Sequence, residues 1–437
     1  MHGTRLDPWF DAYAERAHNL RASEIRALFS VVSRPEVVSL AGGMPNLKDL
    51  PLERLAESAK SLILNHGAQA LQYGSGQGWE PLREQICEIM TYDHIVGADP
   101  DLVVVTTGSQ QALDLMAELF IDTGDVVLAE SPSYVGALGC FRARQADVVH
   151  VDMDEDGLIP SALEETIGRL KKQGRRIKFL YTIPNFQNPA GVTLSEERRP
   201  VIAAICEREH VLILEDNPYG LLGFDRDPLP ALYSYAPETV VYLGSVSKMF
   251  APGMRIGWAL APHAIRDKLI LASEAAILSP TMFGQMFLSQ YLADYDWYGQ
   301  AKSFRSMYRQ RRDAMLSALE EFMPDCTWTK PEGGFYTWVT LPEGLDAKAM
   351  LPRAVRALVA YVSGTAFYYD GRGANHMRLS FCYPTPEDIR EGVRRLSGVV
   401  NAEKELVEMF GTGSIPAGAG DPEHLPGPST VPAPDTL

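Results

Sequence analysis

Seven short apolar runs rich in β-branched residues lie between residues 102 and 262, and helix-like stretches separate them. The runs lack the strict alternation of a half-exposed strand, so each predicts a strand that is buried on both faces. Such strands alternating with helices predict an α/β fold with a mainly parallel, seven-stranded sheet flanked by helices. The runs are Leu102–Val105, Val126–Leu128, Val148–Val151, Phe179–Tyr181, Val211–Leu214, Val240–Leu243 and Ile256–Leu260.

The rest of the chain predicts a smaller α/β unit and two distinct ends. With 437 residues, 46% of them hydrophobic, the chain can form a large domain and a smaller one. Residues 1–45 are expected to form a helical N-terminal arm that is part of the small domain, 46–300 the large domain, and 301–410 the small C-terminal domain. Glycine and proline dominate residues 411–437, which predicts a disordered tail.

Polar side chains follow five of the seven predicted strands. In open parallel sheets, ligands bind outside the carboxyl ends of the strands, so these five segments can converge on one crevice. Their convergence, more than any single motif, predicts a functional site. The segments are Thr106–Gln111, Ser131–Tyr134, Pro184–Gly191, Glu215–Tyr219 and Ser245–Lys248.

Lys248 is the candidate nucleophile among these segments. An amine at a strand end loses pKa when it is buried or flanked by cations, and it can then attack an aldehyde. Ser245 and Ser247 precede it and Arg255 follows it, so two hydroxyl groups and a guanidinium are available for a phosphate. We hypothesise that Lys248 is a Schiff-base lysine that carries pyridoxal 5′-phosphate. Taken alone, the Ser-x-Ser-Lys pattern fits an ordinary loop lysine equally well.

Two other segments carry groups that suit this cofactor. Gly108, Ser109 and Gln110 open a predicted helix, whose free N–H groups and dipole can bind a phosphate, although a plain helix cap has the same sequence pattern. Asp216 can keep the pyridine nitrogen protonated, which makes the ring an electron sink for a carbanion at the substrate Cα. The alternative for Asp216 is a turn cap.

Further candidates hold the ring and the substrate. Tyr134 can stack on the pyridine ring, or it can be an ordinary core tyrosine. Asn188 and Tyr219 can hydrogen-bond the phenolic oxygen of the ring, although Asn-Pro-Ala-Gly alone indicates only a turn. Arg378 offers a bidentate fork for a substrate carboxylate, with a surface ion pair as the alternative. A basic run at Arg305–Arg312, within a helical stretch, is interpreted as a solvated face.

Composition argues against several kinds of partner. A formal charge of −16 disfavours nucleic acid and anionic membranes. The five cysteines are widely spaced and include no Cys-x-x-Cys pair, which indicates reduced thiols in a cytosolic protein. We find no signal-peptide pattern and no apolar run of membrane-spanning length, so a cytoplasmic location is expected. No metal site is predicted.

From about Ser23 to about Gly398, the chain resembles the fold-type I, class I/II aminotransferases, and above all the 2-aminoadipate and kynurenine aminotransferase subgroup. This resemblance implies an aspartate aminotransferase-like fold and pyridoxal phosphate as cofactor. The residues that carry it are Ser39–Pro45, Thr107–Leu115, Ser131–Gly136, Pro184–Gly191, Glu215–Tyr219, Tyr242–Gly257 and Arg378–Phe381.

The resemblance also implies a role for each matching position. Lys248 would bind the cofactor covalently and move a proton between the substrate Cα and C4′ of the cofactor, and Arg378 would bind the α-carboxylate. Gly43 would lie near the substrate, and Tyr73 would reach the phosphate of the other subunit of an obligate homodimer with shared active sites. The phosphate ligands would be Ser109, Gln110, Ser245 and Arg255, and the ring ligands Tyr134, Asn188, Asp216 and Tyr219.

The substrates that follow are an L-amino acid and a 2-oxo acid, which react by a ping-pong mechanism. Aromatic residues in the arm and small domain favour aromatic, large apolar or arylglycine substrates, as in specialised metabolism. No second arginine that could read an acidic side chain is found, as aspartate aminotransferases have, but Arg26 in the arm could meet the distal carboxylate of a 2-aminoadipate-like substrate. The family's Asn-Pro-Thr-Gly reads Asn-Pro-Ala-Gly here, a mild departure because Asn188 is kept.

Two alternatives to a transaminase stay open on the sequence. The same lysine and aspartate serve fold-type I decarboxylases and C–S lyases, which would release carbon dioxide or pyruvate without an amino acceptor. A non-catalytic, aminotransferase-like sensing domain is the other alternative, and the short arm and acidic charge argue against a DNA-binding partner domain.

Overall fold

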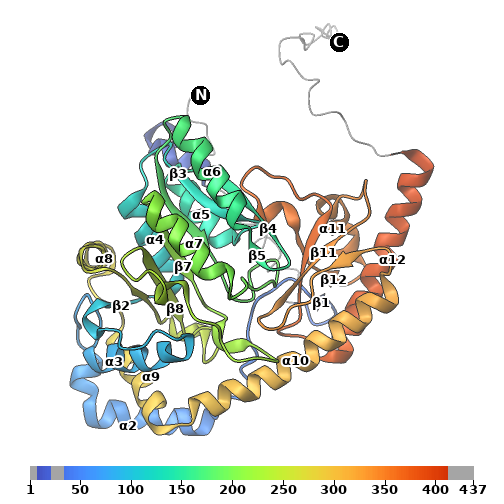
Figure 1. Ribbon diagram of the computed structural model, residues 1–437. Helices are drawn as coiled ribbons and strands as arrows, with labels where there is room; N and C mark the ends of the chain where they lie inside the picture. Colours follow the sequence, from blue (N-terminus) through green and yellow to red (C-terminus); the bar gives the residue numbers. More distant parts are fainter. Residues whose placement is uncertain (1–6, 21–33, 412–437) are drawn as a thin grey trace, which may run out of the picture.

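The computed structural model describes residues 7–20 and 34–411, and an eight-stranded, mainly parallel sheet forms its centre (Figure 1). All seven predicted strands are present, and only the two-residue β5, which pairs antiparallel with β4, was not predicted. In spatial order the strands are β2 (Val103–Thr106), β9 (Gly257–Leu260), β8 (Val240–Ser245), β7 (Leu212–Asp216), β6 (Ile177–Thr182), β3 (Val126–Ser131), β4 (Asp147–Asp154) and β5 (Gly157–Leu158).

Helices shield both faces of this sheet, because successive side chains of each apolar strand point to opposite faces. On β3, Val127 and Ala129 pack with the core side of α4 and α5, whereas Val126 and Leu128 pack against α6 and α7. The flanking helices are α4 (Ser109–Phe120), α5 (Val135–Ala143), α6 (Pro160–Lys172), α7 (Arg198–Glu209) and α8 (His263–Ile277). Beyond the β2 edge lie α2 (Leu52–Ala70), α3 (Glu80–Met90) and α9 (Met282–Asp294).

A second, four-stranded antiparallel sheet lies beside the large one and is covered by α11 (Ala347–Arg356) and α12 (Pro386–Phe410) (Figure 1). The long α10 (Trp297–Phe322) joins the two parts. Near the N-terminus, β1 (Val38–Ser39) pairs with β12 (Val359–Ala360), which brings the end of the arm to the C-terminal part. The proposed domain boundaries at 45, 300 and 410 stay predictions. The four strands are β10 (Thr327–Trp328), β11 (Tyr336–Thr340), β14 (His376–Ser380) and β13 (Val362–Ser363).

The predicted helical arm can be compared with the structure only in part. Residues 7–20 contain two short 3-10 helices, η1 (Phe10–Ala12) and η2 (Glu15–Asn19). Residues 21–33, which include Arg26, lie outside the described residues, as do residues 412–437 of the predicted tail.

The interpretation of the basic run on α10 as a solvated face was wrong. Arg305 Nε donates to the carbonyl of Leu221 at 2.7 Å, and Arg312 Nη1 donates to the carbonyl of Pro331 at 2.6 Å. Arg311 is only 8% exposed and donates to a third loop carbonyl. These guanidinium groups satisfy loop carbonyls that have no sheet or helix partner, so the run ties α10 to loops of both parts of the molecule.

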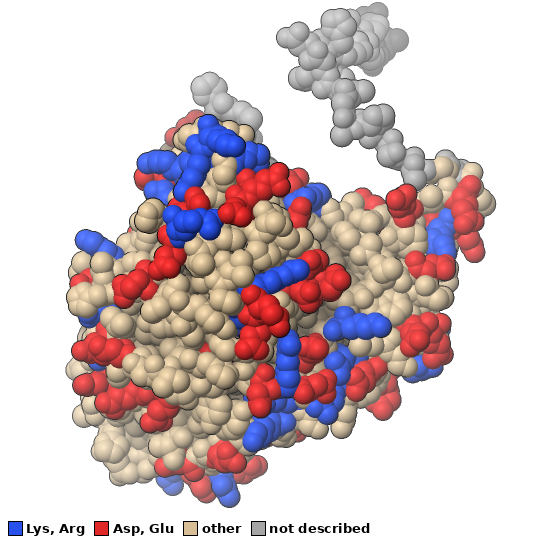
Figure 2. Space-filling model, viewed as in Figure 1, with Lys and Arg blue, Asp and Glu red and all other residues tan. Residues whose placement is uncertain are grey.

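Charged side chains of both signs are interspersed over the face shown in Figure 2, without a broad basic surface. This distribution fits the net charge of −16. Within residues 7–20 and 34–411, none of the helices has both the length and the apolar character that a membrane span requires.

Candidate active site

The sheet topology brings the predicted polar segments to one edge. Because β9 runs antiparallel to both β2 and β8, those two strands point the same way, together with β7, β6 and β3. Gly257, the first residue of β9, lies opposite Thr106 at the end of β2 and Ser245 at the end of β8. The carboxyl ends of the five strands therefore meet where the sequence predicted a crevice.

Lys248 follows the end of β8 in a tight turn. In that turn the Ser247 N–H donates to Ser245 Oγ at 3.1 Å. Lys248 Nζ donates to the carbonyl of Gly43 at 3.0 Å and lies 5.5 Å from the centroid of the Phe335 ring. Burial lowers the pKa of the Lys248 ammonium, and the nearby positive charges of two arginines lower it further. The direction of this shift is the one that a nucleophilic lysine needs.

Asp216 ends β7 with a carboxylate that is 2% exposed. Its Oδ2 accepts a hydrogen bond from the Tyr181 hydroxyl at 2.8 Å, whereas its Oδ1 has no partner within the described residues. Burial raises the pKa of Asp216 to about 6, although the Tyr181 hydrogen bond and the charge of Lys248 act in the opposite direction. A buried, unpartnered carboxylate oxygen is costly unless a ligand satisfies it.

The N-terminus of α4 forms a cradle at the same edge. Gly108 precedes the helix with a φ of +75°, and a Cβ on Gly108 would lie 2.4 Å from Arg255 Nη2. A Cβ on Gly257 would lie 2.5 Å from the backbone nitrogen of Ser109. Both glycines therefore permit a close approach that a larger residue would prevent. The result is a helix N-terminus with an arginine beside it, an arrangement suited to an anion.

Tyr134 lies next to this cradle. Its hydroxyl donates to Gln110 Oε1 at 3.2 Å, and the Gln110 amide nitrogen donates to the carbonyl of Gly136 at 3.1 Å. Burial raises the pKa of the Tyr134 phenol well above its usual range, with the charge of Asp216 as a further cause, so its hydroxyl stays protonated. The predicted neighbours Gln110 and Tyr134 are thus brought together by a direct hydrogen bond.

Arg378 on β14 reaches the cluster from the four-stranded sheet. It is 2% exposed, and it donates from Nη1 to Asn188 Oδ1 at 2.8 Å and from Nη2 to the carbonyl of Ala41 at 2.7 Å. Its guanidinium carbon lies 4.0 Å from the centroid of the Tyr336 ring. The alternative of a surface ion pair is excluded by this burial and by the absence of an ionic partner among the described residues.

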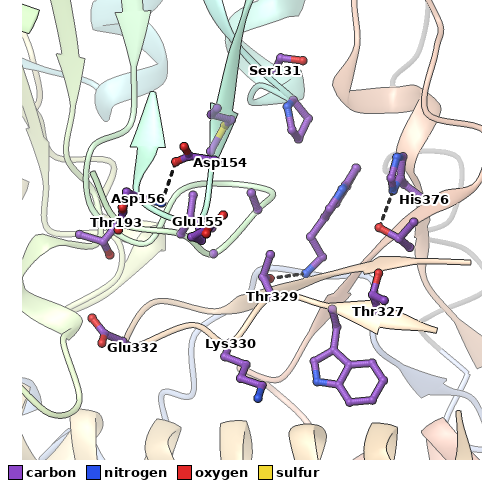
Figure 3. A pocket seen from close by; sticks show the side chains of 18 of the residues that line it. Ser131, Asp154, Glu155, Asp156, Thr193, Thr327, Thr329, Lys330, Glu332 and His376 are labelled. Atoms are coloured by element: carbon purple, nitrogen blue, oxygen red, sulfur yellow. Dashed lines mark hydrogen bonds between the residues drawn. The ribbon is translucent and has the colours of Figure 1, made fainter. Parts of the chain in front are cut away.

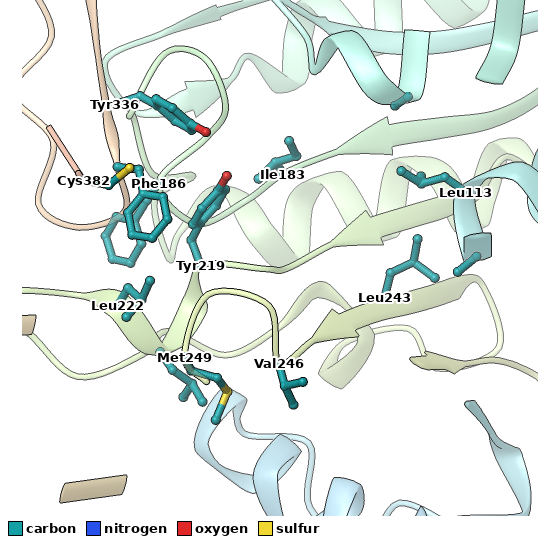
Figure 4. Close-up of a cluster of buried hydrophobic side chains, with 14 of the residues drawn as sticks. Leu113, Ile183, Phe186, Tyr219, Leu222, Leu243, Val246, Met249, Tyr336 and Cys382 are labelled. Atoms are coloured by element: carbon teal, nitrogen blue, oxygen red, sulfur yellow. The ribbon is translucent and has the colours of Figure 1, made fainter. Parts of the chain in front are cut away.

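Tyr219 and Gly43 complete the group that the structure brings together. Figure 4 shows the hydroxyl groups of Tyr219 and Tyr336 pointing toward each other, and their ring centroids lie 6.1 Å apart. A Cβ on Gly43 would lie 2.0 Å from the Tyr336 hydroxyl oxygen, so only glycine fits there. Burial raises the pKa of Tyr219 far above its usual range, which keeps its hydroxyl a hydrogen-bond donor.

Two predicted residues are not part of this group in the single chain. Tyr73 is 78% exposed and lines a surface groove together with Ser279 and Phe283. Arg26 lies outside the described residues. All other candidates lie at or beside the carboxyl edge of the large sheet.

The sequence analysis missed two neighbours of the candidate residues. Tyr181, whose hydroxyl donates to Asp216, is the last residue of a predicted strand. A hydroxyl at that position, next to the predicted polar edge, could have identified it as a site residue. Tyr336 follows the Gly333–Phe335 segment, and no local pattern places it over Arg378.

The structure also contains a separate cavity of about 700 Å³ between the β4–β5 turn and the four-stranded sheet. Asp154 and Asp156 line it from the large sheet, and Thr329 and Lys330 line it from the smaller one (Figure 3). Lys248 and Asp216 do not line this cavity.

Comparison with known proteins agrees with this arrangement. Residues 35–396 match the family model described as aminotransferase class I and II, and the chain belongs to this family. The aromatic-amino-acid aminotransferase 1 of Thermococcus litoralis is 43% identical, over 90% of this chain and 94% of that protein. The chain is therefore an aminotransferase with an aspartate aminotransferase-like fold, as the resemblance implied.

Two solved structures are also similar. The kynurenine aminotransferase of Pyrococcus horikoshii, in complex with PMP, superposes with a TM-score of 0.87 at 39% identity and covers 92% of this chain and 99% of its own. The α-aminoadipate aminotransferase of Thermus thermophilus, in complex with N-(5′-phosphopyridoxyl)-L-leucine, has a TM-score of 0.84 at 36% identity, covering 91% and 100%. The expected subgroup is thereby confirmed.

Proposed function

We propose that this aminotransferase binds pyridoxal 5′-phosphate at Lys248 and moves an amino group from an L-amino acid to a 2-oxo acid in a ping-pong mechanism. The observation that carries the proposal is Asp216, whose buried Oδ1 has no partner among the described residues. A protonated pyridine nitrogen is the donor that this oxygen lacks. The cofactor is also the one that membership of the family implies.

The residues at the other end of the crevice fit the phosphate of the cofactor. Ser109 and Gln110 begin α4, and the positive end of the helix dipole together with Arg255 favours a dianion. Ser245 and Ser247 add hydroxyl donors, and their Oγ atoms lie 2.9 Å apart. Tyr134 would cover one face of the ring.

The bound cofactor supplies an electron sink for negative charge at the substrate Cα. Lys248 Nζ, whose pKa burial lowers, would accept the proton from the substrate Cα and carry it to the cofactor. Asp216, as a carboxylate, would keep the ring nitrogen protonated. Asn188 and Tyr219 would bind the phenolic oxygen, and Arg378 would orient the substrate by its carboxylate.

The proposed amino donor is aromatic, large and apolar, an arylglycine, or 2-aminoadipate-like. Support comes from the names of the relatives, which include aromatic amino acid, kynurenine and 2-aminoadipate enzymes. Phe367 adds an aromatic wall beside the proposed carboxylate site, 5.0 Å from the Arg378 guanidinium. The proposed acceptor is 2-oxoglutarate or pyruvate, and Arg26 is the proposed contact for a distal carboxylate.

We also propose a cytoplasmic homodimer in which Tyr73 reaches the phosphate site of the partner subunit. Exposed apolar side chains near Tyr73 support this proposal, since monomers rarely expose such groups together. Leu71 is 72% exposed and Leu278 is 64% exposed, and the groove of Tyr73 lies between their segments. Analytical ultracentrifugation of the full chain tests it, and a monomer at micromolar concentration would contradict it.

The test of the function is spectroscopic. The purified protein should show a visible band of lysine-bound cofactor, and an amino donor added alone should bleach it. A panel of phenylalanine, phenylglycine, kynurenine, 2-aminoadipate and aspartate then ranks the donors, with aspartate expected to be poor. Lys248→Ala should lack the band, so a variant spectrum identical to that of the wild type contradicts the assignment. Release of carbon dioxide or pyruvate without an acceptor would contradict transamination.

A further inference from the structure

A carboxylate that none of the candidate roles includes is buried behind the site. Glu130, near the end of β3, is 1% exposed and accepts three hydrogen bonds. Its Oε1 accepts from the Thr182 hydroxyl at 2.5 Å, and its Oε2 accepts from the Ile183 N–H at 3.1 Å and from Gln187 Nε2 at 3.0 Å. Burying a carboxylate is costly, and no arginine or lysine pairs with it among the described residues, so these three donors stabilise it.

The contact with Gln187 fixes the orientation of an amide. Gln187 Nε2 also donates to the carbonyl of Pro132 at 2.8 Å, and its Oε1 accepts from the Ala190 N–H at 2.7 Å. If the amide were turned over, Oε1 would face Glu130 and the Pro132 carbonyl, which would place three acceptors together without a proton. Glu130 and the Pro132 carbonyl together therefore keep Oε1 directed at Ala190, across the turn that contains residue 188.

That turn carries Asn188 into the active site. Asn188 is 4% exposed and its Oδ1 accepts the hydrogen bond from Arg378 Nη1 at 2.8 Å. Two residues after Asn188, the Ala190 N–H donates the hydrogen bond to Gln187 Oε1. A displacement of this turn would move Asn188. This residue is both the proposed ligand of the ring oxygen and one of the two groups that bind the Arg378 guanidinium.

We infer that Glu130 is a positioning residue, which acts through Gln187 and the turn at residue 188 to hold Arg378 ready for the carboxylate of the substrate. The inference rests on the proposed role of Arg378. Glu130 touches neither cofactor nor substrate in this scheme. Its effect passes to Asn188 and Arg378 and not to Lys248, because the hydrogen bonds of Glu130 lead to the turn at residue 188.

The chain contains a matched control. Glu215, at the end of the neighbouring β7, is fully buried and likewise accepts backbone hydrogen bonds, from Leu232 and Tyr233, both at 2.9 Å. Its side chain points to the face of the sheet opposite that of the adjacent Asp216. Truncation of either glutamate removes a buried carboxylate and leaves at least one backbone donor without a partner, but only truncation of Glu130 removes a hydrogen-bond partner of Gln187.

The experiment compares Glu130→Ala, Glu130→Gln and Glu215→Ala in two assays. Steady-state kinetics of the loaded enzyme should give Glu130→Ala a KM about tenfold or more above wild type for both amino acid and 2-oxo acid, with kcat changed by less than about threefold. Glu130→Gln keeps acceptors for Ile183 and Gln187, because its NH2 can face the Thr182 hydroxyl, so its KM should stay near wild type.

Hydrogen–deuterium exchange of the apoprotein measures how well the turn is held in place, and it does not depend on catalysis. Exchange of the amides at residues 190 and 191 should accelerate in Glu130→Ala and not in Glu130→Gln or Glu215→Ala. If Glu130→Ala does not fold, Gln187→Leu should give the same rise in KM. Wild-type KM values together with wild-type exchange in the Glu130→Ala variant, or an equal rise in KM in Glu215→Ala, overturn the inference. An inactive wild type with accelerated exchange in Glu130→Ala would contradict the proposed function instead.

Discussion

Replacement of Tyr181 by phenylalanine should weaken cofactor binding in a pH-dependent manner. The Tyr181 hydroxyl donates to Asp216 Oδ2 at 2.8 Å, and the two side chains are 0% and 2% exposed. A hydrogen bond to a charged group contributes about 1.5–3 kcal/mol, and one pKa unit corresponds to about 1.4 kcal/mol. Loss of the hydroxyl therefore raises the pKa of Asp216 from about 6 by about one to two units.

The sign of the effect follows from which form of Asp216 binds. The carboxylate, and not the acid, pairs with a protonated ring nitrogen. With a pKa of about 6, Asp216 is about nine-tenths ionised near neutral pH, and a rise of about 1.5 units lowers that fraction to about one quarter. The affinity of the Tyr181→Phe apoprotein for pyridoxal phosphate should thus fall about fourfold at neutral pH and recover about two pH units higher.

The assay is a titration of apoprotein with pyridoxal phosphate at a series of pH values, read by absorbance. Tyr242→Phe is the control, because Tyr242 donates to Asp93 with the same 2.8 Å geometry and both groups are buried. The control should lose a similar amount of folding stability while the pH dependence of cofactor binding stays that of wild type. Identical pH profiles for Tyr181→Phe and wild type would refute the reasoning.

Three further predictions follow from the same geometry. Gly43→Ala should lower kcat/KM about tenfold or more, because its Cβ would lie 2.0 Å from the Tyr336 hydroxyl, whereas Gly139→Ala, with open space around it, should change nothing; equal kinetics for both would contradict this. Arg378→Lys should raise KM for the amino donor about 10- to 100-fold through loss of the bidentate fork, and an unchanged KM would exclude carboxylate binding there. Burial raises the pKa of Glu215 from 4.5 to about 7, so folding binds a proton between these values and its contribution to stability falls as pH rises through that window. Glu215→Gln should remove this slope, and its melting temperature relative to wild type should rise by a pH-dependent amount equivalent to about 3 kcal/mol; a constant difference across pH would show that Glu215 does not titrate there.

Local patterns were sufficient for the frame of the site. Apolar runs predicted all seven long strands of the large sheet, and the rule that ligands bind at the carboxyl ends placed Asp216 and Lys248 at one edge. Both predictions depend only on residues that are close together in the sequence. The two-residue β5 carries too few side chains to produce such a pattern.

What could not be predicted depends on contacts between distant segments. Tyr336 determines that only glycine fits at Gly43, yet nothing near either residue encodes their proximity. The same holds for the arginines of α10, because the carbonyls that bind Arg305 and Arg311 belong to distant parts of the chain. Glu130 lies between the predicted strand Val126–Leu128 and the predicted polar segment Ser131–Tyr134. Its inferred role depends on Gln187, which comes from another loop. Side-chain pairing across the fold is the information that the sequence pattern lacks.

The charge balance of the site favours anionic ligands in a chain that carries −16 overall. Lys248, Arg255 and Arg378 gather near one buried carboxylate, Asp216, and the two arginines both lower the pKa of the lysine. Arg378 forms no ion pair with any carboxylate of the described residues, and its bonds go to neutral oxygens of Asn188 and Ala41. A buried guanidinium with only neutral partners keeps most of its attraction for an anion. The folded chain places no carboxylate beside Arg255 or Arg378 among the described residues. A phosphate beside Arg255 and a substrate carboxylate beside Arg378 would supply these negative charges. The proposed cofactor and substrate would therefore complete the site electrostatically as well as sterically.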